Sequence, residues 1–180
     1  MRIRYSIRSL VAATASVAGL TAGLLWLTKD YRERRQAEER LRSWGAVYAY
    51  VNEDRQASVV FNRPITSKAL GKLKAIDRVE LQGFAVDDST LEMLGELEKI
   101  DSLMLQSCTL RNETLLSRLD RIPQLRRLHF WSTPITDDVV EALSKLQQVE
   151  CMSFRNTKLT PAGIAKLQAA RPDLKIDSRP

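Results

Sequence analysis

Apolar and polar residues alternate in five short segments of the chain, and these segments recur at a nearly constant spacing. Each alternation ends on a large apolar residue: Phe61, Leu81, Leu105, Phe130 and Phe154. Another apolar residue stands two positions before each of them: Val59, Val79, Leu103, Leu128 and Met152. Because the side chains of a β-strand point alternately to its two faces, this pattern is typical of a half-buried strand. The sequence therefore predicts five short strands, whose final apolar positions lie 20, 24, 25 and 24 residues apart.

A polar capping residue follows most of the predicted strands, and apolar residues at helical spacing follow all of them. The capping residues are Thr66, Asp87, Thr136 and Thr160. The apolar runs are Leu70/Leu73/Ile76, Leu91/Leu94/Leu97, Leu115/Leu119/Ile122, Val140/Leu143/Leu146 and Ile164/Leu167/Ala170. A threonine before acidic residues or before a proline is typical of a helix start, as at Thr136 and Thr160. The repeating unit is therefore a strand, a tight turn and a helix.

A single unit of this size cannot bury its apolar side, whereas stacked units share one continuous core. We therefore predict an α/β solenoid of about five units over residues 58–180, with a parallel sheet on the concave side and helices on the convex side. Solenoids need capped ends, and residues 44–57 are the predicted N-terminal cap. The large side chains expected to cover the first unit are Trp44, Val47, Tyr48 and Tyr50.

An uncharged apolar stretch lies near the N-terminus between two basic flanks. Residues 9–28 are twenty residues without a charge, enough for a helix to cross the roughly 30 Å hydrocarbon core of a bilayer. A basic tail, residues 1–8, precedes this transmembrane helix, and a charged juxtamembrane helix, residues 29–43, is predicted after it. A cleaved signal peptide is the alternative, but no small-residue cleavage pattern ends the stretch. The arginine-rich tail favours an N-inside orientation, with the repeats outside the cytoplasm.

Small residues recur within the predicted transmembrane helix. Ala15, Gly19 and Gly23 lie at four-residue intervals and therefore on one helix stripe. Such a stripe lets two transmembrane helices approach closely, which suggests a weak homodimer. The alternative is that small residues are simply frequent in an alanine-rich segment.

The charge of the chain is concentrated beside the apolar stretch. The formal net charge is +6, and residues 1–44 contain nine Lys/Arg and four Asp/Glu, a balance of +5. Residues 45–180 contain nineteen and eighteen, a balance of +1. Nucleic-acid binding usually needs a clustered basic patch. We therefore expect the repeats to bind no nucleic acid.

The sequence contains no recognisable catalytic or metal-binding constellation. His129 is the only histidine, so a histidine-pair metal site is excluded, and no glycine-rich phosphate loop or nucleophile elbow is present. Cys108 and Cys151 would lie about two strands apart, roughly 10 Å, too far for a disulfide. We expect two free thiols, no metal, no cofactor and no enzymatic activity.

Residues 125–168 resemble the leucine-rich repeats that are abundant in planctomycete bacteria. The unit of that family reads approximately L-x-x-L-x-L-x-x-T-x-[IV]-T-D-x-G-L-x-x-L. Thr133 and Thr157 occupy the position of the asparagine ladder of other repeat subfamilies, Cys108 occupies it in the third unit, and Phe84 departs from the pattern. The apolar helix, the charged helix and the segment RLRSWGAVYAY resemble the membrane-anchored members of this family. The resemblance implies a leucine-rich-repeat fold behind a single-pass anchor.

Strand alternation also predicts which residues face the concave surface, because they stand between the apolar core positions. The candidate partner-binding residues are Arg78, Glu80, Gln82, Met104, Gln106, Arg127, His129, Trp131 and Arg155. An exposed tryptophan beside arginines is typical of interface hot spots, so Trp131 is the leading candidate. The alternative is that a strand end or a loop covers its side chain.

The predicted function is a membrane-anchored module for protein–protein interaction, a scaffold or receptor-like adaptor that binds an unknown protein through the concave face. One alternative is a structural or self-associating envelope component with no specific ligand. Another is a sensor of anionic lipid that acts through residues 29–42.

Overall fold

The computed structural model describes residues 31–33, 35–43, 45–51, 57–64, 76–95, 99–110 and 113–179. The chain divides into two compact units, Met1–Ala37 and Glu38–Pro180. In the first unit the described residues are helical, and Arg35 Nε donates a hydrogen bond to the Tyr31 hydroxyl at 3.0 Å. Across the described ranges, no helix combines the length and the apolar character that a membrane crossing requires. The predicted transmembrane segment 9–28 lies outside them, and so do Ala15, Gly19 and Gly23.

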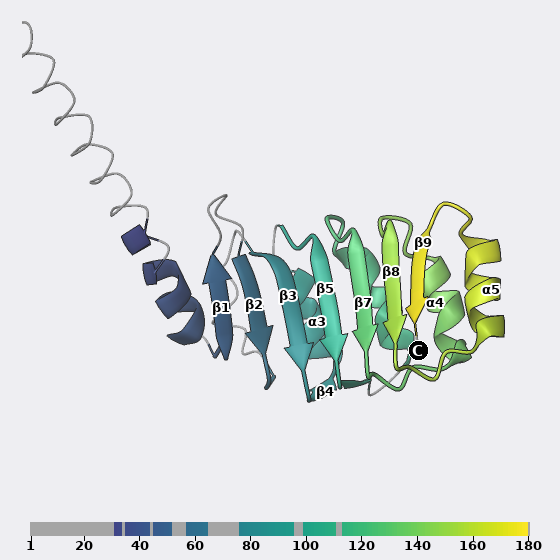
Figure 1. Cartoon of the computed structure of the whole chain (residues 1–180), viewed down its shortest axis with the longest axis horizontal. Helices are drawn as coiled ribbons and strands as arrows, with labels where there is room; N and C mark the ends of the chain where they lie inside the picture. The colour runs from purple at the N-terminus through teal and green to yellow at the C-terminus, as the bar shows by residue number, and fades with distance from the viewer. Residues whose placement is uncertain are drawn as a thin grey trace, which may run out of the picture. The chain divides into compact units, whose positions relative to one another are not determined.

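A seven-stranded sheet forms the second unit (Figure 1). In spatial order its strands are β1 Tyr48–Val51, β2 Ala57–Phe61, β3 Ile76–Gln82, β5 Ser102–Gln106, β7 Arg127–Trp131, β8 Cys151–Arg155 and β9 Lys175–Arg179. Strands β2 to β9 run parallel, and β1 pairs antiparallel with β2. A second, two-stranded sheet joins β4 Ala85–Val86 and β6 Thr109–Leu110.

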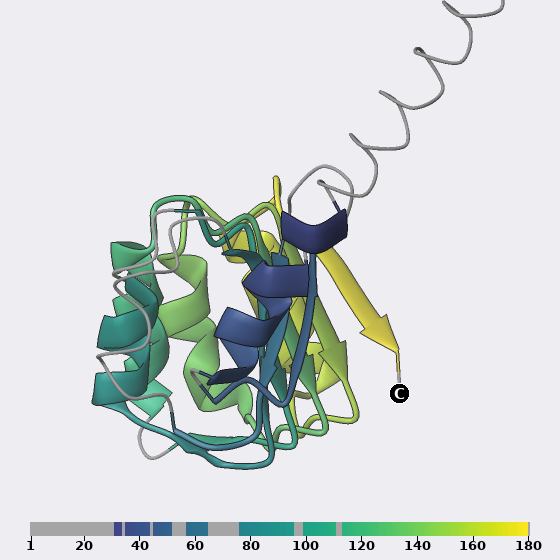
Figure 2. The same cartoon turned by 90° about the vertical axis from the view of Figure 1, so that its left-hand side faces the viewer.

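The helices that follow β3 lie on one side of the large sheet (Figure 2). They are α3 Asp88–Gly95, the 3-10 helix η1 Glu113–Arg121, the 3-10 turn η2 Asp137–Val139 with α4 Val140–Ser144, and α5 Pro161–Ala170. No helix of the described residues covers the other side, which is called the open face below and corresponds to the predicted concave surface. The capping predictions hold where they can be checked, since Asp87, Thr136 and Thr160 each accept a backbone N–H hydrogen bond.

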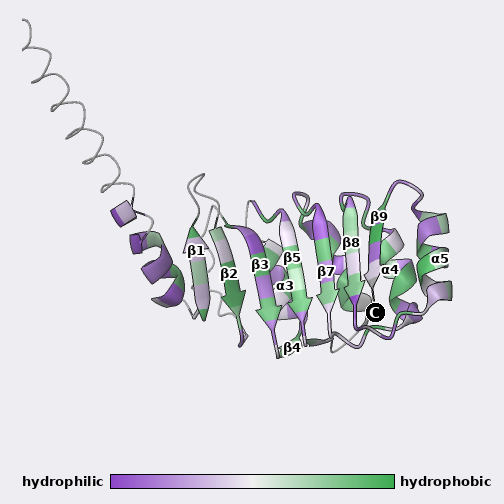
Figure 3. Ribbon diagram, in the orientation of Figure 1, coloured by the Kyte–Doolittle hydropathy of each residue, from purple (hydrophilic) through white to green (hydrophobic). Residues whose placement is uncertain are grey.

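The strand register agrees with the prediction at every core position. Val59 pairs in line with Val79, Leu103, Leu128 and Met152. Phe61 does so with Leu81, Leu105, Phe130 and Phe154. All ten side chains are at most 3% exposed, and the Phe130 and Phe154 rings stack with centroids 5.6 Å apart. The strands consequently carry hydrophobic and hydrophilic residues in alternation (Figure 3).

Three details of the predicted helices and strands differ in the structure. Ile76, placed at the end of a helical run, begins β3 and is buried, as suits a β-branched residue. The third unit has a 3-10 helix rather than an α-helix. A sixth parallel strand, β9, extends the sheet beyond the five predicted strands. Thr66, Leu70, Leu73 and Leu97 lie outside the described residues.

The N-terminal edge of the sheet is covered differently from the expectation. Ala49 and Val51 of β1 face the core, whereas Val47, Tyr48 and Tyr50 are 55%, 52% and 49% exposed. Glu38 contributes to this edge, because its carboxylate accepts a hydrogen bond from Val51 N at 3.3 Å. Leu41 is buried and its carbonyl accepts from Ala46 N at 3.2 Å. Trp44 lies outside the described residues.

A side-chain ladder holds the turns that follow the strands. Thr133 Oγ1 donates to the carbonyl of Leu105 at 3.0 Å and accepts from Cys108 N at 3.4 Å. Cys108 Sγ repeats this contact one unit earlier, donating to the carbonyl of Leu81 at 3.2 Å. Thr133 and Cys108, two of the three predicted ladder positions, thus satisfy buried backbone groups of the neighbouring unit, which would otherwise destabilise the fold. Both cysteines are free thiols.

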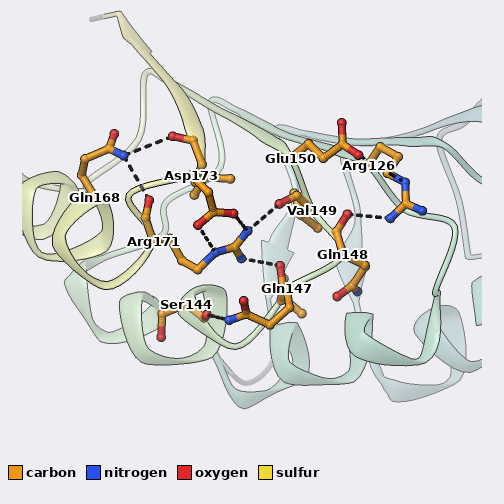
Figure 4. Close-up of polar contacts among 11 residues, drawn as sticks. Arg126, Ser144, Gln147, Gln148, Val149, Glu150, Gln168, Arg171 and Asp173 are labelled. Carbon is orange, nitrogen blue, oxygen red and sulfur yellow. Dashed lines mark hydrogen bonds and ion pairs between the residues drawn. The ribbon is translucent and has the colours of Figure 1, made fainter.

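A buried arginine closes the C-terminal end of the stack (Figure 4). Arg171, only 2% exposed, donates to the carbonyls of Leu146 at 2.7 Å and Val149 at 3.0 Å. Asp173 balances its charge, with 2.7 Å between the carboxylate and Arg171 Nη2. The turn after α5 is therefore tied to the turn before β8, and this places β9 beside β8.

Candidate binding site on the open face

A depression of about 370 Å³ lies on the open face of the sheet. Its lining residues are Arg78, Ser102, Met104, Arg127, His129, Phe130, Trp131, Cys151, Ser153, Arg155 and Asp177. Six of them belong to the predicted partner-binding set: Arg78, Met104, Arg127, His129, Trp131 and Arg155. The other predicted residues, Glu80, Gln82 and Gln106, stand on the same strands but outside the depression. A volume of this size lies in the range of pockets that bind small ligands or anchoring side chains.

Small side chains between large ones create the depression. In the register of the sheet, Ser102 stands between Arg78 and Arg127, and Cys151 stands beside Arg127 on the next strand. Ser153 pairs with His129 and is 8% exposed. Because neither serine nor cysteine fills the space between long neighbours, the sheet surface is hollowed there.

Five lining residues are not among the predicted partner-binding residues: Ser102, Cys151, Asp177, Ser153 and the core residue Phe130. The first two could have been found, since each directly precedes the first core residue of a predicted strand and so faces the open side. Asp177 had no such signal, because the strand that carries it, β9, contains only one apolar residue.

Two of the three arginines in the depression are paired with carboxylates. Arg155 Nη2 lies 3.2 Å from the Asp177 carboxylate, and Arg127 forms an ion pair with Asp101. Both pairs are partly exposed, so each contributes little to stability. For Arg78, the described part of the chain offers no carboxylate within ion-pair distance.

The imidazole of His129 lies in the depression among charged side chains. Burial lowers the pKa of its imidazole below the ordinary value, and the charges of Arg127, Arg78 and Arg155 lower it further. Asp177 acts in the opposite direction. The imidazole is therefore neutral at neutral pH, where it can donate one hydrogen bond and accept another.

The carboxyl group of Glu80 lies on the same face toward the N-terminal side. Burial raises its pKa, and the positive charge of Arg78 partly offsets this increase. Any further cation or hydrogen-bond donor that approaches a partly desolvated carboxylate of this kind stabilises its charged form.

Trp131 presents the largest exposed apolar surface of the depression. Its side chain is 44% exposed, and Gln106 and Arg155 are its neighbours in register on β5 and β8. No strand end or loop of the described residues buries it, in contrast to the covered arrangement considered above. A half-exposed indole beside an arginine can contribute apolar contact area, a hydrogen-bond donor and a stacking surface.

The lining of the depression offers groups that can bind a ligand. Within the described ranges, no group of three or more His, Cys, Asp or Glu side chains is placed to hold a metal ion. Arginines, a neutral imidazole, a methionine and an indole line one open surface. These are groups that recognise anions and apolar side chains.

Comparisons with known proteins identify the fold. No protein-family model matches the chain, and no curated protein matches it. In solved structures, it is similar to a chain in the crystal structure of the Drosophila melanogaster SNF/U2A′ complex, with a TM-score of 0.55 and 14% sequence identity. The match covers 79% of this chain and 82% of that chain, which is a leucine-rich-repeat protein. The second unit therefore has a leucine-rich-repeat type of α/β fold.

Proposed function

We propose that this chain is a membrane-anchored leucine-rich-repeat module, without enzymatic activity, that binds a protein partner through the open face of its sheet. The observation that carries the proposal is the depression on this face, which an exposed indole, Trp131, and three arginines line together. Tryptophan and arginine are the residue types that contribute most to binding at protein interfaces. Fold alone does not determine function, so the proposal rests on this surface.

Crosslinking in native membranes tests the binding function. The natural chain would be compared with a His129→Ala/Trp131→Ala/Arg155→Ala variant and with a control, Arg121→Ala/Gln147→Ala/Lys166→Ala, whose changes lie on exposed residues of the helical side. We expect a partner that the natural chain and the control capture and the open-face variant does not. Equal capture by all three, or by none, would favour the structural, self-associating alternative. Far-UV circular dichroism establishes that the variants are folded.

The anchor is the second part of the proposal, and residues 9–28 support it through their length and lack of charge. The expected result is that the chain stays in the membrane pellet after alkaline carbonate extraction, whereas a Leu20→Lys/Leu24→Lys variant is released. Release of the natural chain would contradict the anchor. Protease accessibility in sealed vesicles tests the proposed location of the repeats outside the cytoplasm.

The proposed weak homodimer depends on the small-residue stripe of the same segment. A Gly19→Leu/Gly23→Leu variant should dimerise less in a membrane two-hybrid assay, because the larger side chains separate the helix backbones. Val17→Leu, on the opposite side of the predicted helix, serves as the control. Unchanged dimerisation of the glycine variant would contradict the hypothesis.

A further inference from the structure

One row of residues across the open face alternates between large and small side chains. Strand pairing aligns Tyr50, Ser58, Arg78, Ser102, Arg127, Cys151 and Lys175, one from each strand. The large members are all exposed, and three of them are cations: Arg78, Arg127 and Lys175. These three residues are called the basic row below.

The basic row has a regular spacing that follows from the sheet itself. Successive members are separated by one intervening strand, so their backbones lie about 10 Å apart at the usual strand spacing. Ser102 and Cys151 occupy the intervening strands and leave gaps between the cations. Two of the three cations, Arg78 and Arg127, also line the depression beside His129. A ligand can therefore contact the cations and enter the hollow between them.

The neighbouring acidic groups leave these cations able to bind an anion. Arg127 is paired with Asp101, but both side chains are substantially exposed, and such pairs are weak enough to exchange partners. A guanidinium also has five N–H donors, and one carboxylate cannot use them all. Burial is the main cause of the lowered pKa of His129, and the charges of Arg127, Arg78 and Arg155 lower it further, whereas Asp177 opposes them.

We propose that the partner presents an extended acidic segment that crosses the strands, with a carboxylate side chain at every third residue bound by Arg78, Arg127 and Lys175. The inference rests on the proposed function and names the chemistry of its partner. A polyproline-II segment rises about 3.1 Å per residue and returns to the same face every three residues, so its carboxylates are about 9 Å apart. This distance is close to the spacing of the basic row.

The balance of charge favours a protein segment over a nucleic acid. Residues 45–180 carry nineteen basic and eighteen acidic residues, and Glu80, Asp101 and Asp177 stand near the basic row. A phosphate backbone would meet these carboxylates along its length and needs a broad positive field. A peptide with isolated carboxylates meets only the cations, and its neutral residues lie beside the acids.

Synthetic probes test the inference on the full chain in detergent micelles. The first is a fluorescent ten-residue peptide with glutamate at every third position and proline or serine elsewhere. The second replaces the glutamates with glutamine, and the third groups the same glutamates at one end. We expect anisotropy to show the tightest binding for the first peptide, weakening with salt. A ten-nucleotide thymidine strand and inorganic phosphate are the competing anions.

Variants locate the binding to the basic row. The affinity for the first peptide should decrease about fivefold in each of the variants Arg78→Ala, Arg127→Ala and Lys175→Ala. It should be unchanged in Arg121→Ala, on the helical side. Because His129 is the only histidine, its NMR titration gives a second measurement: bound carboxylates should raise its pKa.

The possible outcomes separate this inference from the proposed function. The inference would be overturned if the spaced and grouped peptides bound equally, or if the alanine variants of the basic row did not weaken the binding of the spaced peptide. It would also be overturned if the thymidine strand or phosphate bound more tightly than that peptide and depended on the basic row. If a partner is still captured by crosslinking and lost in the Trp131 variant, the proposed function stands without the inference. Row-dependent binding of the spaced peptide supports the inference even before a partner is captured.

Discussion

The carboxylate of Asp177, on β9, lies 3.2 Å from the guanidinium of Arg155, on the neighbouring strand β8. The contact is diagonal, because in the register of the sheet Asp177 pairs with Ser153 and Arg155 pairs with Arg179. The last strand thus supplies an acidic group to a surface whose other charged lining residues are arginines. Asp177 holds Arg155 in place and competes with any acidic ligand for it.

Replacing Asp177 should strengthen the binding of acidic ligands. Asp177→Asn removes a negative charge from the lining of the depression and frees the Arg155 donors. We expect the spaced-glutamate peptide to bind about threefold more tightly at low salt, with a smaller gain at high salt. Asp120→Asn, exposed on the helical side, is the matched control. Weaker binding by Asp177→Asn alone would show that the orientation of Arg155 matters more than its availability.

The pKa of His129 should respond to the charges around it in opposite directions. Arg127→Gln removes a cation that lowers this pKa, so the pKa should rise. Asp177→Asn removes the group that raises it, so the pKa should fall below that of the natural chain. Proton NMR of the single imidazole measures both values. Shifts of the same sign in both variants would contradict the electrostatic account of the depression.

Arg171 should be important for stability although it lies far from the open face. Arg171→Met leaves the buried carbonyls of Leu146 and Val149 without their donor, which should lower the free energy of unfolding by about 3 kcal/mol. Arg126→Met is the control, since Arg126 makes a similar contact to the Gln148 carbonyl at 2.9 Å but is 41% exposed (Figure 4). Its loss should cost less than about 1 kcal/mol. Urea denaturation compares the two, and equal effects would contradict the role of burial.

The ladder residue Thr133 should depend on its hydroxyl group. Thr133→Val keeps the shape of the side chain but leaves Cys108 N and the Leu105 carbonyl unpaired, which should lower stability by about 1–2 kcal/mol. Thr133→Ser retains the hydroxyl and should cost less. The comparison can be made by thermal unfolding. If the serine variant is the less stable of the two, the methyl contact rather than the hydrogen bonding is decisive.

Asp137 should make part of the stability depend on pH. Its carboxylate accepts hydrogen bonds from Thr160 N at 2.8 Å and Thr160 Oγ1 at 2.7 Å, and these lower its pKa. Since the folded pKa lies below the unfolded value, the stabilisation is complete above the unfolded pKa and is lost as the pH falls through the folded pKa. Asp137→Asn should therefore show a shallower decrease of stability in acid. An unchanged acid profile would assign that decrease to other carboxylates.

The same carboxylate explains why a glycine stands at position 163. A Cβ atom there would lie 2.2 Å from Asp137 Oδ1, so Gly163→Ala has to displace the carboxylate from Thr160. We expect this variant to be less stable at neutral pH and to lose part of its dependence on acid pH. In the Asp137→Asn background the alanine should have a different, smaller effect on the acid profile, because the titrating group is already absent. Additive acid profiles of the two changes would contradict this coupling.

The sequence by itself determined the repeating unit, its core residues and the parallel direction of its strands. The five large apolar residues that end the predicted strands, and the apolar residues two positions before them, were predicted to face the core in register. All ten of them do. This succeeds because a shift of one residue would move every apolar side chain of a strand to the solvent. The resemblance to leucine-rich repeats placed Thr133 and Cys108 in the ladder, and both side chains form hydrogen bonds with buried backbone groups there.

Only the tertiary structure decided how the two ends of the sheet are built and where its surface is hollow. Strand β9 has one apolar residue, and it forms because β8 offers an unpaired edge and Arg171 holds the preceding turn beside it. At the other end, Tyr48 and Tyr50 face outward since Ala49 and Val51 occupy the limited space against the core. The depression arises where Ser102, Cys151 and Ser153 come to lie between longer side chains of other strands. Side chains that are neighbours across strands are about twenty-four residues apart in sequence. A local sequence pattern therefore does not predict which large, small or charged side chains will lie side by side.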